Sequence, residues 1–490
     1  MDNVNRKWYS GMLTTEDWWA VWIGLFMFLL GLLSLTGVDL VGWMAKTHTW
    51  ALGHPEKGFA TSLSAAGKAY ADMSPLASFL VTYAVFTALT CIGAYFMKLN
   101  VKKFFVGFTI IFLITWACWV IGHEAHFKAT PNQWEKYGIT WGLSLGGGFS
   151  YLLALAVGLF IGNFMKKFAG FLSEAAKPEW FIKTAIVYLG VKVGLMSMEA
   201  ASYTFELAAA GAAATFVAYM LFWPIVYTLG RRVFKLPRQW AAVLSSGISV
   251  CGVSAAVATG GAIRAKPIIP VMVSMLIVVF AMMELIVLPG LYTTFLSDEP
   301  IVAGAAMGMT VKTDGADAAA GAIMDEMMRA KAAQSGIFWQ EGWILTSAIM
   351  TKIWIDMFIG IWAFVLALIW VYRVERQPGQ LHVGASEIWF RFPKFVLGYI
   401  IAWFVYVGIA MFLPDLVDAA VVGANTVQSP MRKMMFMLTF VSIGIITDFS
   451  KLRGMGRLAL LYAIALVVII APIALIVAWI FHHGMMPLPA

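Results

Sequence analysis

A membrane-length apolar segment of this chain, residues 302–321, is interrupted in its middle by the polar sequence GMTVKTDGAD at residues 308–317. Lys312, Asp314 and Asp317 place formal charges where a spanning helix would meet hydrocarbon. A lysine or aspartate at the centre of a spanning helix costs roughly 2.5–3.5 kcal/mol, so such residues usually serve a function. Non-helical backbone at that depth persists only where it is buried in protein or lines a watery cavity. The sequence therefore predicts a polar site inside a membrane, which is typical of a transporter.

The composition places the whole chain in a membrane. Hydrophobic residues make up 61% of the 490 residues and charged residues only 12%, whereas soluble domains carry about 25% charged residues. The net charge of +8 does not indicate nucleic acid, because the basic residues gather in short loops between apolar segments. Cys91, Cys118 and Cys251 lie in apolar stretches without metal-like spacing, so no disulfide framework is expected. The composition thus makes the lipid bilayer the expected partner of this protein. The first apolar span lacks a small-residue cleavage site, so we expect it to be retained.

Apolar stretches of about 20 residues predict about eleven uninterrupted spanning helices and an all-α polytopic fold. They begin near Trp18, Pro75, Phe104, Gly148, Ile182, Glu206, Ile268, Trp343, Phe395, Met434 and Leu458. Two further segments, residues 239–263 and 301–323, are apolar but rich in Gly, Ser and Thr, and we expect them to be broken.

The charges in the loops predict the orientation of the chain. Basic loops occur around Lys98, Lys166, Arg231, Arg373 and Lys451, and acidic connections around Glu199, Asp298 and Asp415. The positive-inside rule places the basic set in the cytoplasm. The protein is then a multi-pass protein of the bacterial inner membrane, with its N-terminus in the cytoplasm and its C-terminus outside.

The same rule addresses how the two broken segments run. If both cross the membrane, Arg264 and Lys266 lie outside, which the rule disfavours. If each enters and returns on its own side, the first from the cytoplasm and the second from outside, every loop falls on the expected side. Paired discontinuous segments of this kind build the midplane site of inverted-repeat transporters. We therefore favour two re-entrant segments over two crossing ones.

The first broken segment contains the sequence SSGISVCGVS at residues 245–254. Glycine lets backbone N–H groups approach a ligand, and a half-helix that follows presents its positive N-terminal end to an anion. Hydroxyl groups would add donors. The predicted substrate contacts in this segment are Ser246, Ser249, Gly252 and Ser254. Close helix packing is the alternative, because small residues mediate helix contacts in membranes.

In the second segment Asp314 and Asp317 are three residues apart and would share a helical face. Two carboxylates on one face can hold Na⁺ or a proton, with Thr313 beside them, and these three residues form the predicted coupling-ion site. Lys312 can pair with the acids or face an anion, and Thr310 is a further predicted substrate contact. An exposed acidic loop is the alternative, and the apolar run before it argues against that.

Other charges occur within apolar segments. Lys192 lies in mid-span and is either a counter-charge for substrate or a partner of an acid such as Asp314. Lys352 and Asp356 are four residues apart on one helix face and can neutralise each other. Glu284 is a candidate proton carrier, although a structural acid facing a pore is the simpler interpretation.

The chain divides into two predicted regions. Residues 1–146 form an addition with three membrane helices and an irregular outer part that bears His48, His54, His123 and His126. Residues 147–490 form the transporter domain with inverted repeats. A weak internal similarity between residues 188–195 and 442–449 is consistent with duplication. The added helices offer a surface for a homodimer interface.

Four motifs carry a resemblance to a known group. They are residues 158–163 (GLFIGN), 188–195 (YLGVKVGL), 246–255 (SGISVCGVSA) and 348–353 (AIMTKI). From about residue 149 to 480 the chain resembles the YeiH-like sulfate exporter family of membrane proteins. The resemblance implies a fold similar to bile-acid/sodium symporters and sodium/proton antiporters, with five-helix inverted repeats, a panel domain and a core domain.

This chain departs from that family at three places. Residues 308–312 read GMTVK where the family has a Gly-x-Ser-Ile-His pattern, and Asp314 and Asp317 follow. The N-terminal helices are an addition, and the polar connection at residues 324–341 is longer.

Together these features predict a secondary active transporter of a small anion, such as sulfate, sulfite or a sulfonate, coupled to Na⁺ or H⁺. Lys192 or Lys312 would be the counter-charge, and no cofactor other than Na⁺ is expected. The alternative is a cation/proton antiporter in which Asp314 and Asp317 are the substrate site. A channel or a membrane scaffold ranks lower. No ATP-binding motif occurs, and scattered histidines without a nucleophile–base spacing argue against an enzyme.

Overall fold

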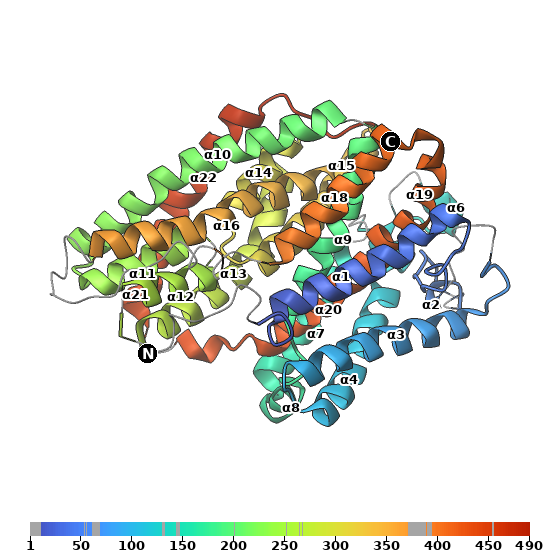
Figure 1. Ribbon diagram of the computed structural model, residues 1–490, viewed down its shortest axis with the longest axis horizontal. Helices are drawn as coiled ribbons and strands as arrows, with labels where there is room; N and C mark the ends of the chain where they lie inside the picture. Colours follow the sequence, from blue (N-terminus) through green and yellow to red (C-terminus); the bar gives the residue numbers. More distant parts are fainter. Residues whose placement is uncertain are drawn as a thin grey trace.

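A computed structural model of the chain describes residues 11–52, 54, 56–60, 69–129, 133–143, 148–199, 201–250, 252–263, 265–266, 268–370, 389, 394–452 and 455–490. These residues form helices and connecting loops, and within them the only β-type pairing consists of two isolated bridges. The all-helical prediction is therefore confirmed. Figure 1 shows the helices in two groups that lie side by side.

The first group combines the N-terminal helices with segments from the middle and the end of the chain. It contains α1 (Glu16–Leu32), α3 (Pro75–Phe96), α4 (Val101–Gly122), α7 (Gly148–Phe164), α8 (Lys166–Leu172), α9 (Pro178–Glu199), α18 (Phe395–Phe412), α19 (Val417–Thr426), the π-helical turn η6 (Val427–Met431) and α20 (Arg432–Ile446). Short helices α2 (Glu56–Phe59), α5 (Ala125–Lys128) and α6 (Trp134–Tyr137) lie in its connecting loops. Helix α9 packs against α1, α18 and α20, so it lies at the centre of the group.

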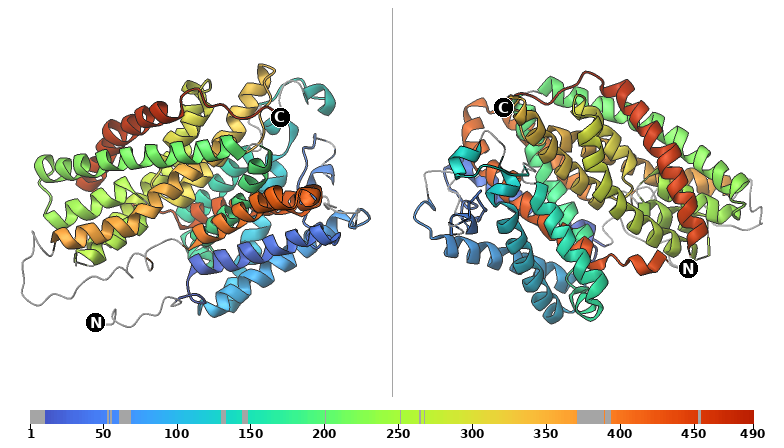
Figure 2. Two further views of the ribbon diagram at one scale, coloured as in Figure 1. Left: turned by 45° about the horizontal axis from the view of Figure 1, so that its top comes forward. Right: turned by 180° about the vertical axis from the view of Figure 1, so that it is seen from behind.

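The second group surrounds the two broken segments. It contains α10 (Ala201–Thr228), η3 (Leu229–Val233), α11 (Arg238–Ser249), α12 (Gly252–Ala262), α13 (Ile268–Phe295), α14 (Pro300–Thr310), α15 (Asp314–Gln334), α16 (Trp343–Ile369), α21 (Gly456–Ile464), η8 (Ala465–Ile470) and α22 (Ala471–His482). Figure 2 shows from two further directions that the blue N-terminal helices lie on the side of the molecule away from the red C-terminal helix. Helix α15 contacts both groups, because it packs against α13 and α16 and also against α7 and α9.

The described residues contain eight helices long and apolar enough to cross a membrane, or nine if the bent pair α7–α8 is one span. The sequence predicted about eleven. The expected spans near Ile182 and Trp343 correspond to α9 and α16, which are 22 and 27 residues long but are not among the eight. Both helices carry charged side chains inside the protein, for example Lys183 and Lys352, as expected of helices that surround a polar site.

Close helix packing explains several glycines of the first group. A Cβ atom on Gly158 of α7 would collide with the backbone of α20, and Gly190 of α9 stands equally close to the Tyr399 backbone of α18. Small residues let membrane helices approach in this way.

The N-terminal helices are joined to the rest of the molecule by the same core. Helix α1 packs on α9 and α4 on α7, and one continuous cluster of buried apolar side chains includes residues from both regions. Asp17 at the start of α1 also pairs with Lys183 of α9 at 2.7 Å.

Candidate functional site

The second broken segment folds into a helical hairpin, α14–α15. Helix α14 starts just after α13 ends, and α15 returns to that same end, where Lys331 Nζ donates to the Thr293 carbonyl at 3.0 Å and to Ser297 Oγ at 3.1 Å. The hairpin tip, residues 311–313, therefore points away from this end and into the helix bundle.

The first broken segment, α11–α12, forms a hairpin from the opposite end. Helices α11 and α12 pack against each other. Arg457 at the start of α21 donates to the Phe234 carbonyl, just before α11. From there α21, η8 and α22 run as one 27-residue helix that ends just before His483. The Nδ1 atom of His483 lies 2.7 Å from Oε1 of Glu299, which directly precedes α14. A helix of that length spans about 40 Å, so the two hairpins open at opposite ends of the molecule. This is the course of the chain that two re-entrant segments require.

The two tips meet at Gly252. This residue has φ of +35°, and a Cβ atom on it would collide with the Lys312 carbonyl oxygen. A left-handed φ and a contact with backbone are both conditions that favour glycine. Gly252 thus brings the backbone of one tip against the backbone of the other, and its contact with substrate stays a prediction.

Lys352 links the two tips. Its Nζ atom, which reaches them from α16, donates to the Val311 carbonyl at 2.9 Å and to the Val250 carbonyl at 3.4 Å. These carbonyls follow the last turns of α14 and α11, where helix dipoles place partial negative charge. One buried ammonium group therefore neutralises the ends of both half-helices. The sequence offered Lys352 only as a partner of Asp356.

The break in the second hairpin has further partners. Glu284 of α13 accepts from the Lys312 backbone N–H at 3.2 Å and from the Tyr462 hydroxyl at 3.2 Å. The Lys312 side chain folds back onto the end of α14, where its Nζ atom donates to the Met309 carbonyl and stands 5.0 Å from the centre of the Phe222 ring. Lysine binds the last carbonyls of helices in this manner. Glu284 and Lys312 thus stabilise the broken backbone.

Asp317 is the least satisfied group at the tips. Its side chain is fully buried on the first turn of α15, and neither carboxylate oxygen has a hydrogen-bond partner in the described part of the chain. The cations that act on it are Lys352 first and Lys312 second. A buried carboxylate without hydrogen bonds is costly, so a bound cation or a proton would stabilise it.

Asp314 and Thr313 face a cavity of about 320 Å³ between the two helix groups. The polar part of its lining consists of Glu16, Glu179, Lys183, Thr313, Asp314 and Thr447. The Thr313 hydroxyl also caps α15 by accepting from Ala316 N–H at 3.2 Å. Asp317 is not part of this lining, so the two aspartates, expected on one face, meet different surroundings.

Three of the remaining predicted substrate contacts, Ser246, Ser249 and Thr310, have buried side chains. Ser246 is buried and accepts from Trp223 Nε1 at 3.0 Å. The buried Ser249 hydroxyl has no hydrogen-bond partner in the described part of the chain. Thr310 donates to the Ala306 carbonyl at 2.7 Å within its own helix. The Ser254 side chain lies outside the described residues, as does Cys251.

Lys192 lies at a different place. Its side chain lies against Gly342, 3.3 Å from where a Cβ atom would stand, and its charge acts on Glu341. This is a second polar region, at the far end of α15. Glu326 in that region is twelve residues beyond Asp314, about 18 Å along the helix. No group of three or more His, Cys, Asp or Glu side chains suited to a metal ion occurs among the described residues.

The polar centre was only partly visible in the sequence. The sequence singled out Gly252, Lys312 and Asp317, but missed Lys352 as the link between the tips and Tyr462 as a partner of Glu284. Charged residues within apolar runs were the available signal for Lys352 and Glu284, whereas nothing in the sequence marks Tyr462.

The fold and this site define a multi-pass, all-helical membrane protein in which two helical hairpins meet at a buried polar centre. The chain belongs to the family described as Conserved hypothetical protein 698, whose model matches residues 148–463. It is 64% identical over 489 residues to a UPF0324 membrane protein of Nitrosomonas europaea, and the match covers 99% of each chain.

More distant relatives agree with this membership. A UPF0324 membrane protein of Rhodopirellula baltica is 32% identical over 380 residues, which are 75% of this chain and 61% of that one. One of Nitratidesulfovibrio vulgaris is 31% identical over 416 residues, or 83% and 63% of the two chains. The chain thus spans less than two thirds of these two relatives. No solved structure matches it.

Proposed function

We propose that this protein is a secondary active transporter that moves a small oxyanion and couples its movement to Na⁺ or H⁺. The observation that carries the proposal is the meeting of the two hairpin tips at Gly252 and Lys312, linked by Lys352 beside the unsatisfied carboxylate of Asp317. Transporters place substrate and ion sites at such paired helix breaks. A static scaffold would gain nothing from burying these charges.

Alternating access follows from where the cavities lie. The cavity at Asp314 opens between the two helix groups at one end of α15, and a second polar cavity, at Glu326 and Glu341, lies toward its other end. Movement of the hairpin-bearing group relative to the other group would expose the tips to each cavity in turn. In this account the first group acts as a panel domain and the second as a core domain, the two kinds of domain that the resemblance to the sulfate exporter family implies.

The orientation is also part of the proposal. The basic loops place the opening of the α11–α12 hairpin in the cytoplasm and that of the α14–α15 hairpin outside. The chain then lies in the bacterial inner membrane with its N-terminus inside, and homodimers would form through the N-terminal helices.

Asp317 is the proposed coupling residue, with Asp314 at the cavity as the entry point for the ion. When Na⁺ or H⁺ neutralises Asp317, Lys352 loses the negative charge of that carboxylate. The electrostatic potential at the tips then becomes more positive. The N-terminal ends of α12 and α15 also contribute positive potential there. An oxyanion is bound more strongly at that moment, so ion and anion move together. The substrate crosses chemically unchanged.

A cation/proton antiporter is the second candidate, because a buried aspartate beside a lysine can exchange its lysine partner for a cation. In that case Asp317 and Asp314 bind the transported ion, and Lys352, rather than Lys192 or Lys312, replaces it in the empty state.

Uptake into proteoliposomes distinguishes the two. The wild-type protein and the Asp317→Asn variant are tested with labelled sulfate, sulfite and taurine, with and without a Na⁺ or pH gradient. Asp418→Asn is the matched control, because that aspartate is exposed. Our proposal predicts gradient-driven anion uptake, and in Asp317→Asn anion exchange that gradients no longer drive. If no oxyanion is taken up and Asp317→Asn abolishes proton-coupled cation exchange, the protein is an antiporter.

A further inference from the structure

A basic cavity lies at the end of the molecule where the α14–α15 hairpin opens. Its volume is about 260 Å³. The charged and imidazole side chains in its lining are Lys46, His48, His123, Lys128 and Lys433, and Thr47, Thr49 and Ser429 add hydroxyl groups. No acidic side chain belongs to the described lining. A cavity holds a water molecule once it offers about 10–15 Å³, so this one has room for a polyatomic ion. We call it the basic vestibule.

The N-terminal region builds one wall of the vestibule. Residues 46–49 are fixed at both ends: Ala45 N–H donates to Thr82 Oγ1 at 2.9 Å, and Trp50 exchanges backbone hydrogen bonds with His123 and Ala125 at 3.2 and 2.7 Å. The nearby acid, Glu124, is occupied in capping α5, where it accepts from the backbone N–H and from Nδ1 of His126 at 2.9 and 2.8 Å. The wall therefore presents the ammonium groups of Lys46 and Lys128 to the cavity.

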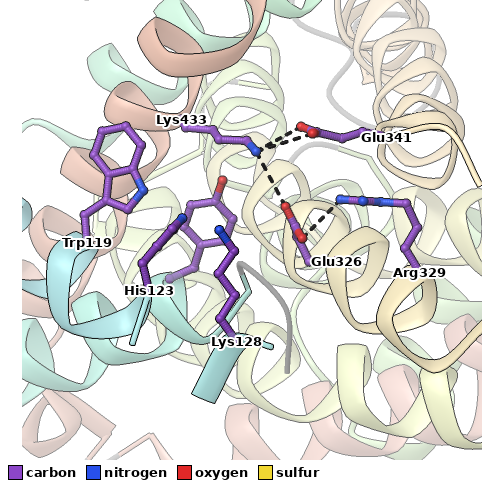
Figure 3. Close-up of a pocket in the computed structure, with 8 residues that line it drawn as sticks. Trp119, His123, Lys128, Glu326, Arg329, Glu341 and Lys433 are labelled. Carbon is purple, nitrogen blue, oxygen red and sulfur yellow. Dashed lines mark hydrogen bonds and ion pairs between the residues drawn. The ribbon is translucent and has the colours of Figure 1, made fainter. Parts of the chain in front are cut away.

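A neighbouring cavity, which shares Lys128 and Lys433 with the vestibule, is lined by an ion-pair network whose charges balance. Figure 3 shows Lys433 between Glu341 and Glu326, with Arg329 on the far side of Glu326. Arg329 also pairs with Asp325, and Arg432 with Glu341. These three acids face three cations, and Lys192 adds a further positive charge to Glu341. Glu326 and Glu341 act on Lys128 from this network, but both already pair with its cations.

Lys46 and Lys128 therefore supply two positive charges in excess at one cavity. Neither makes an ion pair among the described residues. In Figure 3 the Lys128 ammonium points from the His123 side toward the network without a bond to it. Burial, and then the charge of Lys433, lowers the pKa of Lys128 to about 8 and lowers the pKa of Lys46. Cations that repel each other in a partly closed cavity are stabilised by an anion placed between them.

We propose that the basic vestibule binds a small tetrahedral oxyanion, of the sulfate or phosphate class, between Lys46, Lys128 and Lys433. The proposed role of the site is to concentrate the anion at one end of the translocation path, and this role rests on the proposed function. Binding of the anion to the vestibule does not itself require transport. Clefts lined by charge of one sign raise the local concentration of the opposite ion. Anion binding at the vestibule would also give the N-terminal region a function, because that region supplies one wall of the site.

The test is calorimetric titration of the full-length protein in detergent with sodium sulfate at constant ionic strength. Sodium chloride and short-chain phosphatidylglycerol are titrated in parallel, because a lipid phosphate shares the chemistry of the free anion. We expect saturable sulfate binding that is weakened at least about tenfold by Lys128→Gln and by Lys46→Gln, since a charged hydrogen bond is lost in each. Lys57→Gln, at an exposed lysine of the same region, should bind as the wild type does. Thermal melts confirm that each variant is folded.

Three results would overturn the inference: no saturable sulfate binding by the wild type, equal sulfate affinity in the two vestibule variants, or binding of phosphatidylglycerol alone. The Asp317→Asn variant separates this inference from the proposed function, because that substitution should leave vestibule binding intact while it uncouples transport. Sulfate binding in a protein that transports nothing would support the vestibule and refute the carrier. Transport that survives Lys46→Gln and Lys128→Gln, without vestibule binding, would do the reverse.

Discussion

Replacing Gly252 by alanine should separate the two hairpin tips. The new Cβ atom would stand 2.7 Å from Ile277 Cγ2 and collide with the Lys312 carbonyl oxygen, which is backbone and cannot rotate away. The left-handed φ of +35° costs a non-glycine residue roughly 1–2 kcal/mol, and overpacking a buried site costs about 1–3 kcal/mol more. The expected destabilisation is therefore about 2–5 kcal/mol, together with loss of transport.

The matched control for this prediction is Gly290→Ala. Gly290 lies inside the spanning helix α13, and a Cβ atom there would meet nothing within 4 Å. Alanine in that helix should be neutral or stabilising by about 0.5–1 kcal/mol. Thermal melts in detergent and proteoliposome uptake, measured for both variants, decide the matter. If Gly252→Ala melts and transports like Gly290→Ala, the tips do not touch as described.

Two further predictions concern the lysines. Lys352→Met should destabilise the fold by about 3–5 kcal/mol, because the buried Asp317 loses the cation that acts on it most strongly. The double variant Lys352→Met/Asp317→Asn should recover part of that loss in a thermal melt, and no recovery would contradict this interaction. Sulfate affinity should be full below pH 8 and fall by about tenfold per pH unit above it, because Lys128, whose pKa is lowered to about 8, must be protonated to bind the anion. His48, whose pKa burial and neighbouring lysines lower, is neutral in that range, so calorimetry on Lys128→Gln should show a smaller loss of sulfate affinity between pH 7 and about 9 than the wild type shows.

The sequence predicted the hairpins because their signal is local. Lys312, Asp314 and Asp317 interrupt an apolar run within a few residues, and that pattern has a direct energetic meaning in a membrane. Among the described residues, nine of the expected spans correspond to helices long and apolar enough to cross a membrane, when the bent pair α7–α8 is taken as one span.

The partners of those charges could not be predicted, because they depend on tertiary packing. Lys352 lies about 40 residues after Val311 and 100 after Val250, and only the fold of α16 brings it to both carbonyls. Lys192 appears in the sequence as a mid-span charge like the others, yet α9 carries it to Gly342 instead. The basic vestibule combines loop residues with the start of α20, so no single sequence motif predicts it.

Side-specific cysteine labelling tests the central claim, that the two hairpins enter the membrane from opposite faces. In a variant whose native cysteines are replaced by alanine, single cysteines are introduced at the exposed positions Arg238 and Lys266, which flank the first hairpin, and Asp298 and Ser335, which flank the second. An impermeant maleimide added to intact cells should label positions 298 and 335 but neither 238 nor 266. Labelling of only one position in either pair would mean that the segment crosses the membrane, which would contradict the account.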